Sequence, residues 1–250
     1  MPAHAVDPVP RAYVRWRTPY PAALWARVDA WRSGRAELAV DLGAGTGLAT
    51  RDLCARFAQV VAVDGDPAMV EEQPLPSSVE VRVQRAEEAH FVRESVDLVV
   101  FANALHWMDA DAVLGNARGW LAPDGVVAAW RPLVPELQGR VQEVVQEELR
   151  TRWDRFRHPR LRGRDWTRRA VEAHEALEVV DEREITVEVD TDLDRLCGFL
   201  STVSFVNAYA RSTGDREGYL TAFWERLRAV GEGTSMRVAV TYELAIARGR

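Results

Sequence analysis

The hydrophobic positions of this chain fall into two patterns that alternate along most of its length. Short apolar runs, such as Leu38, Ala39, Val40 and Leu42, are typical of strands that are buried on both faces. Apolar residues at helical spacing, as from Leu48 to Phe57, predict helices between those strands. The expected strands cover residues 38–42, 59–63, 79–83, 95–101, 125–130, 179–189 and 237–247. The expected helices cover residues 22–31, 48–57, 112–121, 192–209 and 218–230.

The order of these elements predicts the fold class. Strands and helices alternate up to residue 130, which favours an α/β protein with a doubly wound, Rossmann-like parallel sheet. The full order matches a seven-stranded sheet whose last strand inserts antiparallel. A helical cap is expected to be inserted after strand five.

The domain organisation follows from the same pattern. With 250 residues, 47% of them hydrophobic, the chain is expected to form a single domain over 1–250. Its first twelve residues carry three prolines and are expected to be a loose arm. The expected parts are an arm and helix (1–35), a core (36–131), cap elements (132–178 and 191–230) and final strands (179–190 and 236–248).

A glycine-rich loop follows the first strand and is the first candidate for chemistry. Asp41 precedes Gly43, Ala44, Gly45 and Gly47, and a helix follows. A strand that turns through glycines into a helix aims backbone N–H groups and a helix dipole at a ligand. The alternative is a tight turn that needs glycine only for its backbone. The dinucleotide fingerprint requires a glycine at position 48, where this chain has leucine.

An acidic residue ends the second strand. Asp64 stands 23 residues after Asp41, a suitable distance for a carboxylate that binds a ribose diol. Gly65 follows it, and Asp66 before Pro67 is an ordinary helix cap. With Asp64 on the ribose, Met69 is expected to lie against the face of an adenine ring.

Two motifs carry a family resemblance. The spacing Asp-x-Gly-x-Gly-x-Gly at 41–47 resembles motif I of class I S-adenosylmethionine (SAM)-dependent methyltransferases. The string Val-Asp-Leu-Val from Val96, followed by Ala-Leu-His-Trp-Met-Asp from Ala104, is similar to trans-aconitate methyltransferase-like (methyltransferase type 11) proteins. The resemblance is strongest over 38–130 and thinner in the cap. It implies SAM as the cofactor, with the glycine loop around its methionine part.

The resemblance also implies roles for residues outside the loop. Ala86 and Glu87 match a pair that holds adenine, although a solvated acidic loop fits their spacing equally well. Asn103 lies just after strand four, where the family places the sulfonium and the incoming nucleophile. Tyr13 and Arg17 match the family's N-terminal arm and are expected to close on the SAM carboxylate or on the substrate. The alternative for these two is a surface arm.

His106 and Trp107 are the candidates for acting on the substrate. His106 follows strand four and ionises near working pH, so it is the best candidate for a general base. The alternative is a histidine that only packs or hydrogen-bonds, because a carboxylate acceptor needs no base. Trp107 is expected to be a pocket wall, with plain core packing as its alternative.

Charge and composition limit the classes of partner that the protein is expected to bind. A formal charge of −6 argues against a general nucleic-acid binder. The segment Arg150 to Arg169 has nine arginines, which indicates either a solvated charged helix and loop or a basic patch for an anionic substrate. No apolar run reaches the ~18 residues of a membrane helix and no signal peptide is evident, so a cytoplasmic location is expected. The five histidines form no ligand cluster, so no metal is expected. A monomer and a homodimer both remain open.

The resulting hypothesis is a SAM-dependent methyltransferase for a small molecule, with O-methylation of an anionic acceptor favoured. All 32 basic residues are arginine, which indicates a GC-rich genome and, by association only, secondary metabolism. One alternative is a SAM-binding protein of the same fold that transfers no methyl group. An RNA or protein methyltransferase is disfavoured, because RNA amino-group methylation uses Asn/Asp-Pro-Pro-Tyr where this chain has Asn103-Ala-Leu-His. A nicotinamide oxidoreductase is disfavoured by Leu48 and Asp41.

Overall fold

The computed structural model of the protein describes residues 7–32, 34–231 and 235–250. The chain forms two compact units. We call Pro19–Leu133, Gly163–Ile185 and Thr241–Arg250 the sheet unit, and Met1–Thr18, Val134–Arg162 and Thr186–Val240 the helical unit. The expected single domain therefore stays a prediction, and the two units are described one at a time.

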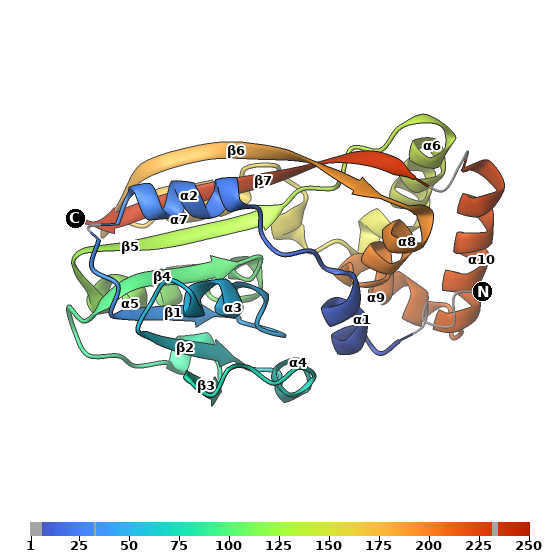
Figure 1. The fold of residues 1–250 in the computed structure, drawn as a ribbon. Helices are drawn as coiled ribbons and strands as arrows, with labels where there is room; N and C mark the ends of the chain where they lie inside the picture. Colours follow the sequence, from blue (N-terminus) through green and yellow to red (C-terminus); the bar gives the residue numbers. More distant parts are fainter. Residues whose placement is uncertain (1–6, 33, 232–234) are drawn as a thin grey trace. The chain divides into compact units, whose positions relative to one another are not determined.

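A seven-stranded sheet organises the fold, in the order β3-β2-β1-β4-β5-β7-β6 (Figure 1). Strands β1 to β5 pair in parallel, and β7 runs antiparallel to β5 with Ile246 opposite Ala128. The strands are β1 (Leu38–Leu42), β2 (Gln59–Asp64), β3 (Val79–Val83), β4 (Val96–Ala102), β5 (Leu121–Pro132), β6 (Leu177–Thr191) and β7 (Met236–Gly249). The predicted seven-stranded α/β sheet with an antiparallel last strand is confirmed.

The helices of the sheet unit connect these strands. They are α2 (Ala22–Ala30), α3 (Leu48–Cys54), α4 (Pro67–Glu71), α5 (Ala110–Trp120) and α7 (Trp166–Glu172), with 3₁₀ turns η1 (Ala86–Glu88) and η2 (Leu105–Trp107). Helix α3 ends three residues before the predicted Phe57, although the Phe57 N–H still donates to the Leu53 carbonyl at 3.0 Å. Among the described residues, no helix combines the length and the apolar character needed to cross a membrane.

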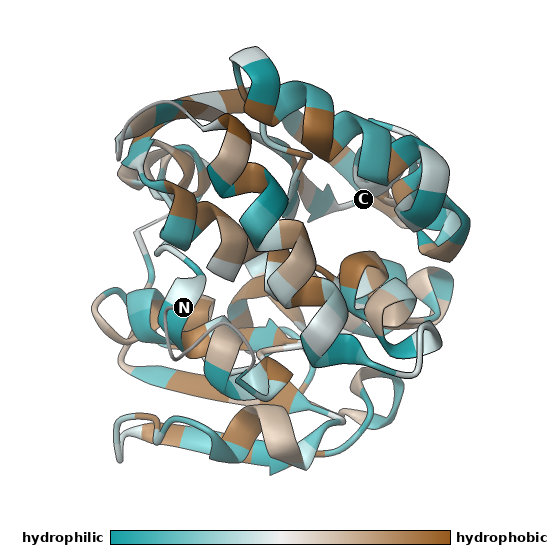
Figure 2. Cartoon of the chain, turned by 90° about the vertical axis from the view of Figure 1, so that its right-hand side faces the viewer, coloured by the Kyte–Doolittle hydropathy of each residue, from teal (hydrophilic) through white to brown (hydrophobic). Residues whose placement is uncertain are grey.

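The helical unit is built from the segments that flank the core in the sequence. Its helices are α1 (Val9–Trp16), α6 (Gly139–Glu148), α8 (Leu193–Ser201), α9 (Ser204–Ser212) and α10 (Arg216–Val230), and short turns η3 (Leu149–Trp153), η4 (Asp154–Phe156) and η5 (Pro159–Leu161) follow α6. The cap helices predicted after strand five are confirmed. Figure 2 shows that most helices facing the viewer carry both hydrophobic and hydrophilic stretches, as expected of elements with one buried face.

Two expectations about this unit are wrong. The expected loose arm is helical from Val9 onward, because Pro8 and Pro10 stand before and within the first turn, where proline costs no hydrogen bond. The single helix expected over 192–209 is two helices, α8 and α9. Ser201 and Thr202 turn their hydroxyls back to the carbonyls of Gly198 and Phe199, and this local bonding competes with helix continuation.

The core of the sheet unit lies on both faces of the central strands. On one face, side chains of β1, β4 and β5 pack with Val113, Leu114 and Ala117 of α5 and Val171 of α7. On the other face, the Trp130 ring of β5 lies 5.2 Å from the rings of both Tyr20 and Trp25. The burial on both faces explains why these strands are continuous apolar runs in the sequence.

Candidate functional site

The glycine loop between β1 and α3 has a backbone that only glycine adopts easily. Gly43, Gly45 and Gly47 have φ angles of 76°, 56° and 81°. A Cβ atom on Gly43 would lie 2.4 Å from the Ala104 Cβ, and one on Gly47 would lie 2.3 Å from Leu75 Cδ2. The loop therefore needs glycine both for its left-handed conformation and for its close approach to neighbouring chain.

The N–H groups of the loop donate to the protein itself. Those of Gly43 and Ala44 reach the Val63 carbonyl at 2.8 and 3.1 Å, and that of Gly47 reaches the Ala44 carbonyl at 2.9 Å. The Gly45 N–H donates to Asp64 Oδ2 at 2.7 Å. These four N–H groups therefore have acceptors within the chain, and the expectation that N–H groups point at a ligand stays a prediction for the rest of the loop. The four bonded groups hold the loop in shape against the end of β2.

Asp64 links the end of β2 to the loop. Its second oxygen, Oδ1, accepts the Asp66 N–H at 2.9 Å, and Asp66 in turn accepts the Ala68 N–H at 3.0 Å and caps α4. The Met69 methyl would lie 3.4 Å from a Cβ built on Gly45. The structure thus brings together Gly45, Asp64 and Met69, three of the predicted cofactor residues. Gly65 is exposed at the same turn.

Asp41 is fully buried below the loop. Its Oδ2 accepts the Thr50 hydroxyl at 2.7 Å, whereas its Oδ1 is buried with no hydrogen-bond partner in the described structure. Burial raises the pKa of Asp41 to about 7, the Thr50 hydrogen bond opposes this rise, and the charge of Asp64 adds to it. Thr50 was not among the predicted site residues, and its only signal in the sequence is a hydroxyl in the first turn of the helix that follows the loop.

This buried acid predicts a pH-dependent stability. Folding raises the pKa of Asp41 from 3.8 to about 7, so its contribution is full below pH 3.8 and is lost as the pH rises through 7. Replacing Asp41 by asparagine removes this titration. We expect the free energy of unfolding of the wild type, relative to Asp41→Asn, to fall by about 2 kcal/mol between pH 5 and pH 7. Urea denaturation of both proteins at each pH measures this difference, and parallel pH curves would contradict the prediction.

Ala86 and Glu87 lie in the turn after β3. Ala86 is buried, and Glu87 Oε1 accepts the Asp109 N–H at 2.9 Å. Partial burial alone raises the pKa of Glu87, but the Asp109 N–H and the Arg85 guanidinium outweigh it and hold the pKa below its usual value. Glu87 is thus held by the chain, and the freely solvated acidic loop is wrong for this residue. Its contact with adenine stays a prediction.

Asn103, His106 and Trp107 follow β4. Asn103 has a left-handed φ of 58°, which asparagine tolerates better than most residues, and its N–H donates to the Trp130 carbonyl at 2.7 Å. His106 is only 4% exposed, with its ring 4.8 Å from that of Trp107. Trp107 is 59% exposed, so the alternative that it packs in the core is wrong. Its role as a pocket wall stays a prediction.

Tyr13 and Arg17 belong to the helical unit. The Arg17 Nε donates to Thr202 Oγ1 at 2.7 Å. Its guanidinium lies 4.7 Å from the Tyr13 ring centroid and 4.6 Å from that of Phe199. Arg17 is therefore fixed between two rings against α8, and a loose surface arm is wrong for this pair. Their contact with substrate or cofactor stays a prediction.

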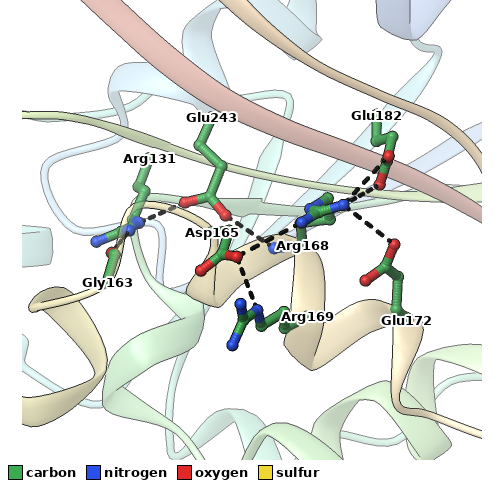
Figure 3. Close-up of polar contacts among 8 residues, drawn as sticks. All are labelled: Arg131, Gly163, Asp165, Arg168, Arg169, Glu172, Glu182 and Glu243. Atoms are coloured by element: carbon green, nitrogen blue, oxygen red, sulfur yellow. Dashed lines mark hydrogen bonds and ion pairs between the residues drawn. The ribbon is translucent and has the colours of Figure 1, made fainter.

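The arginines at the end of the arginine-rich segment have carboxylate partners within the sheet unit (Figure 3). Arg168 pairs with Glu182 at 3.2 Å, and Arg169 pairs with Asp165 at 2.7 Å. Arg164 pairs with Glu184 at 3.2 Å. These three arginines therefore follow the first alternative, a solvated charged helix and loop, with each guanidinium paired to a carboxylate of the same chain. A basic patch for an anionic substrate stays a prediction for the arginines before them, in the helical unit.

The sheet order, the glycine loop after β1 and the acid at the end of β2 together define the SAM-dependent methyltransferase fold. The family model "Methyltransferase domain" (Methyltransf_11) matches residues 40–129. Residues 40–129 belong to the class I SAM-dependent methyltransferase family.

Individual relatives agree with this assignment. Trans-aconitate 2-methyltransferase of Methylobacterium radiotolerans is 36% identical over 135 residues, which cover 49% of this chain and 48% of that protein. The yeast protein CRG1, assigned as a SAM-dependent methyltransferase, is 30% identical over 132 residues, 50% of this chain and 45% of its own. The chain thus spans about half the length of the curated relatives it matches.

One solved structure matches nearly the whole chain. It comes from Anaeromyxobacter dehalogenans and is assigned as a type II methyltransferase. The TM-score is 0.74 at 27% identity, with 94% of this chain and 97% of that chain covered. The match extends beyond residues 40–129 and includes the segments on either side.

Proposed function

We propose that this protein transfers the methyl group of SAM to a small-molecule acceptor. The observation that carries the proposal is the junction of the glycine loop with the end of β2, where the Gly45 N–H meets Asp64 at 2.7 Å. This junction stands at the carboxyl ends of parallel strands, where open α/β sheets bind their ligands. The match of residues 40–129 to the methyltransferase family supports the same conclusion.

The residues at this junction suit the ribose and the adenine that they are proposed to bind. A carboxylate offers about four lone-pair sites. Asp64 uses two of them on the N–H groups of Gly45 and Asp66, which leaves capacity for two ribose hydroxyls. Met69 beside Gly45 and the buried Ala86 offer apolar contact for adenine, with Glu87 next to them. Asp41 supports the loop Gly43–Gly47 from below, and Asn103 is proposed to lie beside the reacting sulfur.

The chemistry asked of the protein is mainly alignment. When bound, SAM supplies an activated methyl group for in-line displacement. The residues of this chain then need to orient the acceptor, exclude water and, for a hydroxyl acceptor, remove a proton. We propose O-methylation, with an anionic acceptor that is recognised by the helical unit. Arg17 supports this proposal, because a guanidinium fixed between two rings is preorganised to bind a carboxylate.

Calorimetric titration with SAM, S-adenosylhomocysteine and NADH tests the proposed cofactor. We expect the two adenosyl compounds to bind and NADH to give no heat. Binding of NADH alone would overturn the proposal. Binding of SAM without turnover of any acceptor in a screen of carboxylates, phenols and amines would favour a SAM-binding protein that transfers no methyl group.

Replacing Asp64 by alanine is expected to weaken SAM binding by ~1–3 kcal/mol, because charge-assisted hydrogen bonds to the ribose are lost. The matched control is Asp66→Ala, two residues away, which removes only the cap of α4. The same titration measures both variants. Equal affinity of Asp64→Ala and the wild type would remove Asp64 from the site.

His106 is proposed as the base for a hydroxyl acceptor. Replacing it by alanine is expected to lower turnover by ~10²-fold while SAM affinity stays unchanged. Because His106 is buried, His106→Gln and a thermal melt of each variant show whether packing alone is disturbed. Turnover at the wild-type level in a folded variant would exclude His106 as the general base. The acceptor would then be one that needs no base.

A further inference from the structure

Strand β3 forms one edge of the seven-stranded sheet and carries an alternating sequence (Figure 1). Its residues are Val79, Glu80, Val81, Arg82 and Val83. Val81 and Val83 are 41% and 54% exposed, although β2 beside them is buried over Val60–Val63. An exposed apolar edge strand is a template for pairing with another strand, and proteins usually blunt or cover it.

The direction of the backbone groups is fixed by the pairing with β2. The Gln84 N–H donates to the Asp64 carbonyl of β2 at 3.0 Å. In a parallel ladder consecutive residues point their N–H and C=O groups alternately to the two sides, so Val81 and Val83 point theirs outward. The Val79 N–H is already taken by the Pro76 carbonyl at 2.9 Å.

We propose that β3 pairs antiparallel with β3 of a second copy of this chain, centred on Val81. In this register Val81 faces Val81, and Val79 faces Val83 of the second copy. The N–H and C=O groups of Val81 then pair with those of Val81 of the second copy across a two-fold axis, and the Val83 N–H meets the Val79 carbonyl of the second copy. The proposal concerns assembly and does not rest on the proposed function.

Charge complementarity is the reason to propose a second copy of this chain as the partner and Val81 as the centre of the pairing. Glu80 and Arg82 lie on the same face and form an ion pair at 2.7 Å within one strand. About a centre at Val81, Glu80 of each copy stands opposite Arg82 of the other, which gives two cross-strand ion pairs. A shift of the centre to residue 80 or 82 instead places Glu80 opposite Glu80 or Arg82 opposite Arg82, and like charges directly opposite are destabilising.

The interface is small, because it rests on one five-residue strand from each copy. Stable dimers bury about 1,200–2,000 Å² in total, so we expect a weak dimer that dissociates on dilution. Sedimentation velocity over a hundredfold range of concentration measures this equilibrium. A monomer at all concentrations would overturn the proposal.

Charge variants distinguish this interface from any other. In Glu80→Arg the introduced arginine stands opposite Arg82 of the other copy, and in Arg82→Glu the introduced glutamate stands opposite Glu80. Each variant alone is therefore expected to associate at least ~10-fold more weakly than the wild type. An equimolar mixture of the two restores both ion pairs and is expected to dimerise as the wild type does. Thermal melts show that each variant is folded. A mixture that stays monomeric, or single variants that dimerise normally, would contradict the proposed pairing.

Cross-linking tests the register. Opposed residues of a hydrogen-bonded antiparallel pair have Cα atoms about 5.5 Å apart, within the range that a disulfide spans. Val81→Cys is therefore expected to give a disulfide-linked dimer under mild oxidation. Val83→Cys is the control, because the two introduced cysteines would lie about 13 Å apart. The wild-type protein, oxidised in the same way, shows any cross-linking that comes from its own cysteines, Cys54 and Cys197. Cross-linking through position 83 and not 81 would exclude the register.

Discussion

Replacing Glu243 by alanine is expected to lower the free energy of unfolding by about 3–5 kcal/mol. Glu243 of β7 and Arg131 of β5 stand opposite each other in the sheet, and their side chains are only 5% and 4% exposed. The Arg131 Nε donates to Glu243 Oε2 at 2.6 Å (Figure 3). Removal of the carboxylate leaves a buried guanidinium without its counter-charge.

The cost extends beyond the ion pair, because Glu243 has a second task. Its Oε1 accepts the Arg168 N–H at 3.0 Å in the first turn of α7. Arg131 also donates to the Gly163 carbonyl, just before that helix. The pair therefore attaches the segment Gly163–Arg168 to the sheet, and the loss of Glu243 leaves the Arg168 N–H in need of a new partner.

Urea denaturation of the wild type and the variant measures this loss. Glu182→Ala is the matched control, since Glu182 pairs with Arg168 at 3.2 Å but is 43% exposed, and surface pairs contribute about 0–1 kcal/mol. The double variant Arg131→Met with Glu243→Met is expected to be more stable than Glu243→Ala, because it leaves no charge stranded. A cost for Glu243→Ala no larger than that for Glu182→Ala would show that the pair is not buried in solution.

The strands of the sheet could be predicted because burial on both faces leaves a local mark in the sequence. Each of β1, β2 and β4 is mostly apolar in sequence, with a single acidic residue. The Arg131–Glu243 pair leaves no such mark, because its members are 112 positions apart and meet only through the register of β5 and β7. A residue's charge shows nothing about which distant strand will lie beside it.

In the candidate site, too, local features could be predicted from the sequence and features that depend on packing could not. Asp64 and Asp66 could be assigned from the sequence, because strand ends and helix caps are local features. The burial of His106 and the exposure of Trp107 could not be predicted, since the two residues share one 3₁₀ turn and only its packing separates them. The bonding of the Gly43, Ala44 and Gly45 N–H groups could not be predicted from the motif, because their acceptors lie on β2, outside it.

Replacing Gly43 by alanine is expected to weaken SAM binding more than ~100-fold and to lower the free energy of unfolding by about 3 kcal/mol. The added Cβ would lie 2.4 Å from the Ala104 Cβ and 2.8 Å from the Met108 methyl, at a φ of 76°. The Met108 side chain can move aside. Ala104 cannot easily do so, because the neighbouring Asn103 N–H is bonded to the Trp130 carbonyl of β5 at 2.7 Å.

We therefore expect the strain to reach the glycine loop, whose N–H groups bond to the end of β2. A shift of the loop at Gly43 moves Gly45 away from Asp64, and with it the junction on which the proposed cofactor site depends. Gly119→Ala is the matched control, because a Cβ at Gly119 meets nothing within 4 Å and alanine suits its helix. Calorimetry with SAM and a thermal melt compare the two variants. If Gly43→Ala lost stability but bound SAM with the wild-type affinity, the loop would be a structural turn and the cofactor site would lie elsewhere.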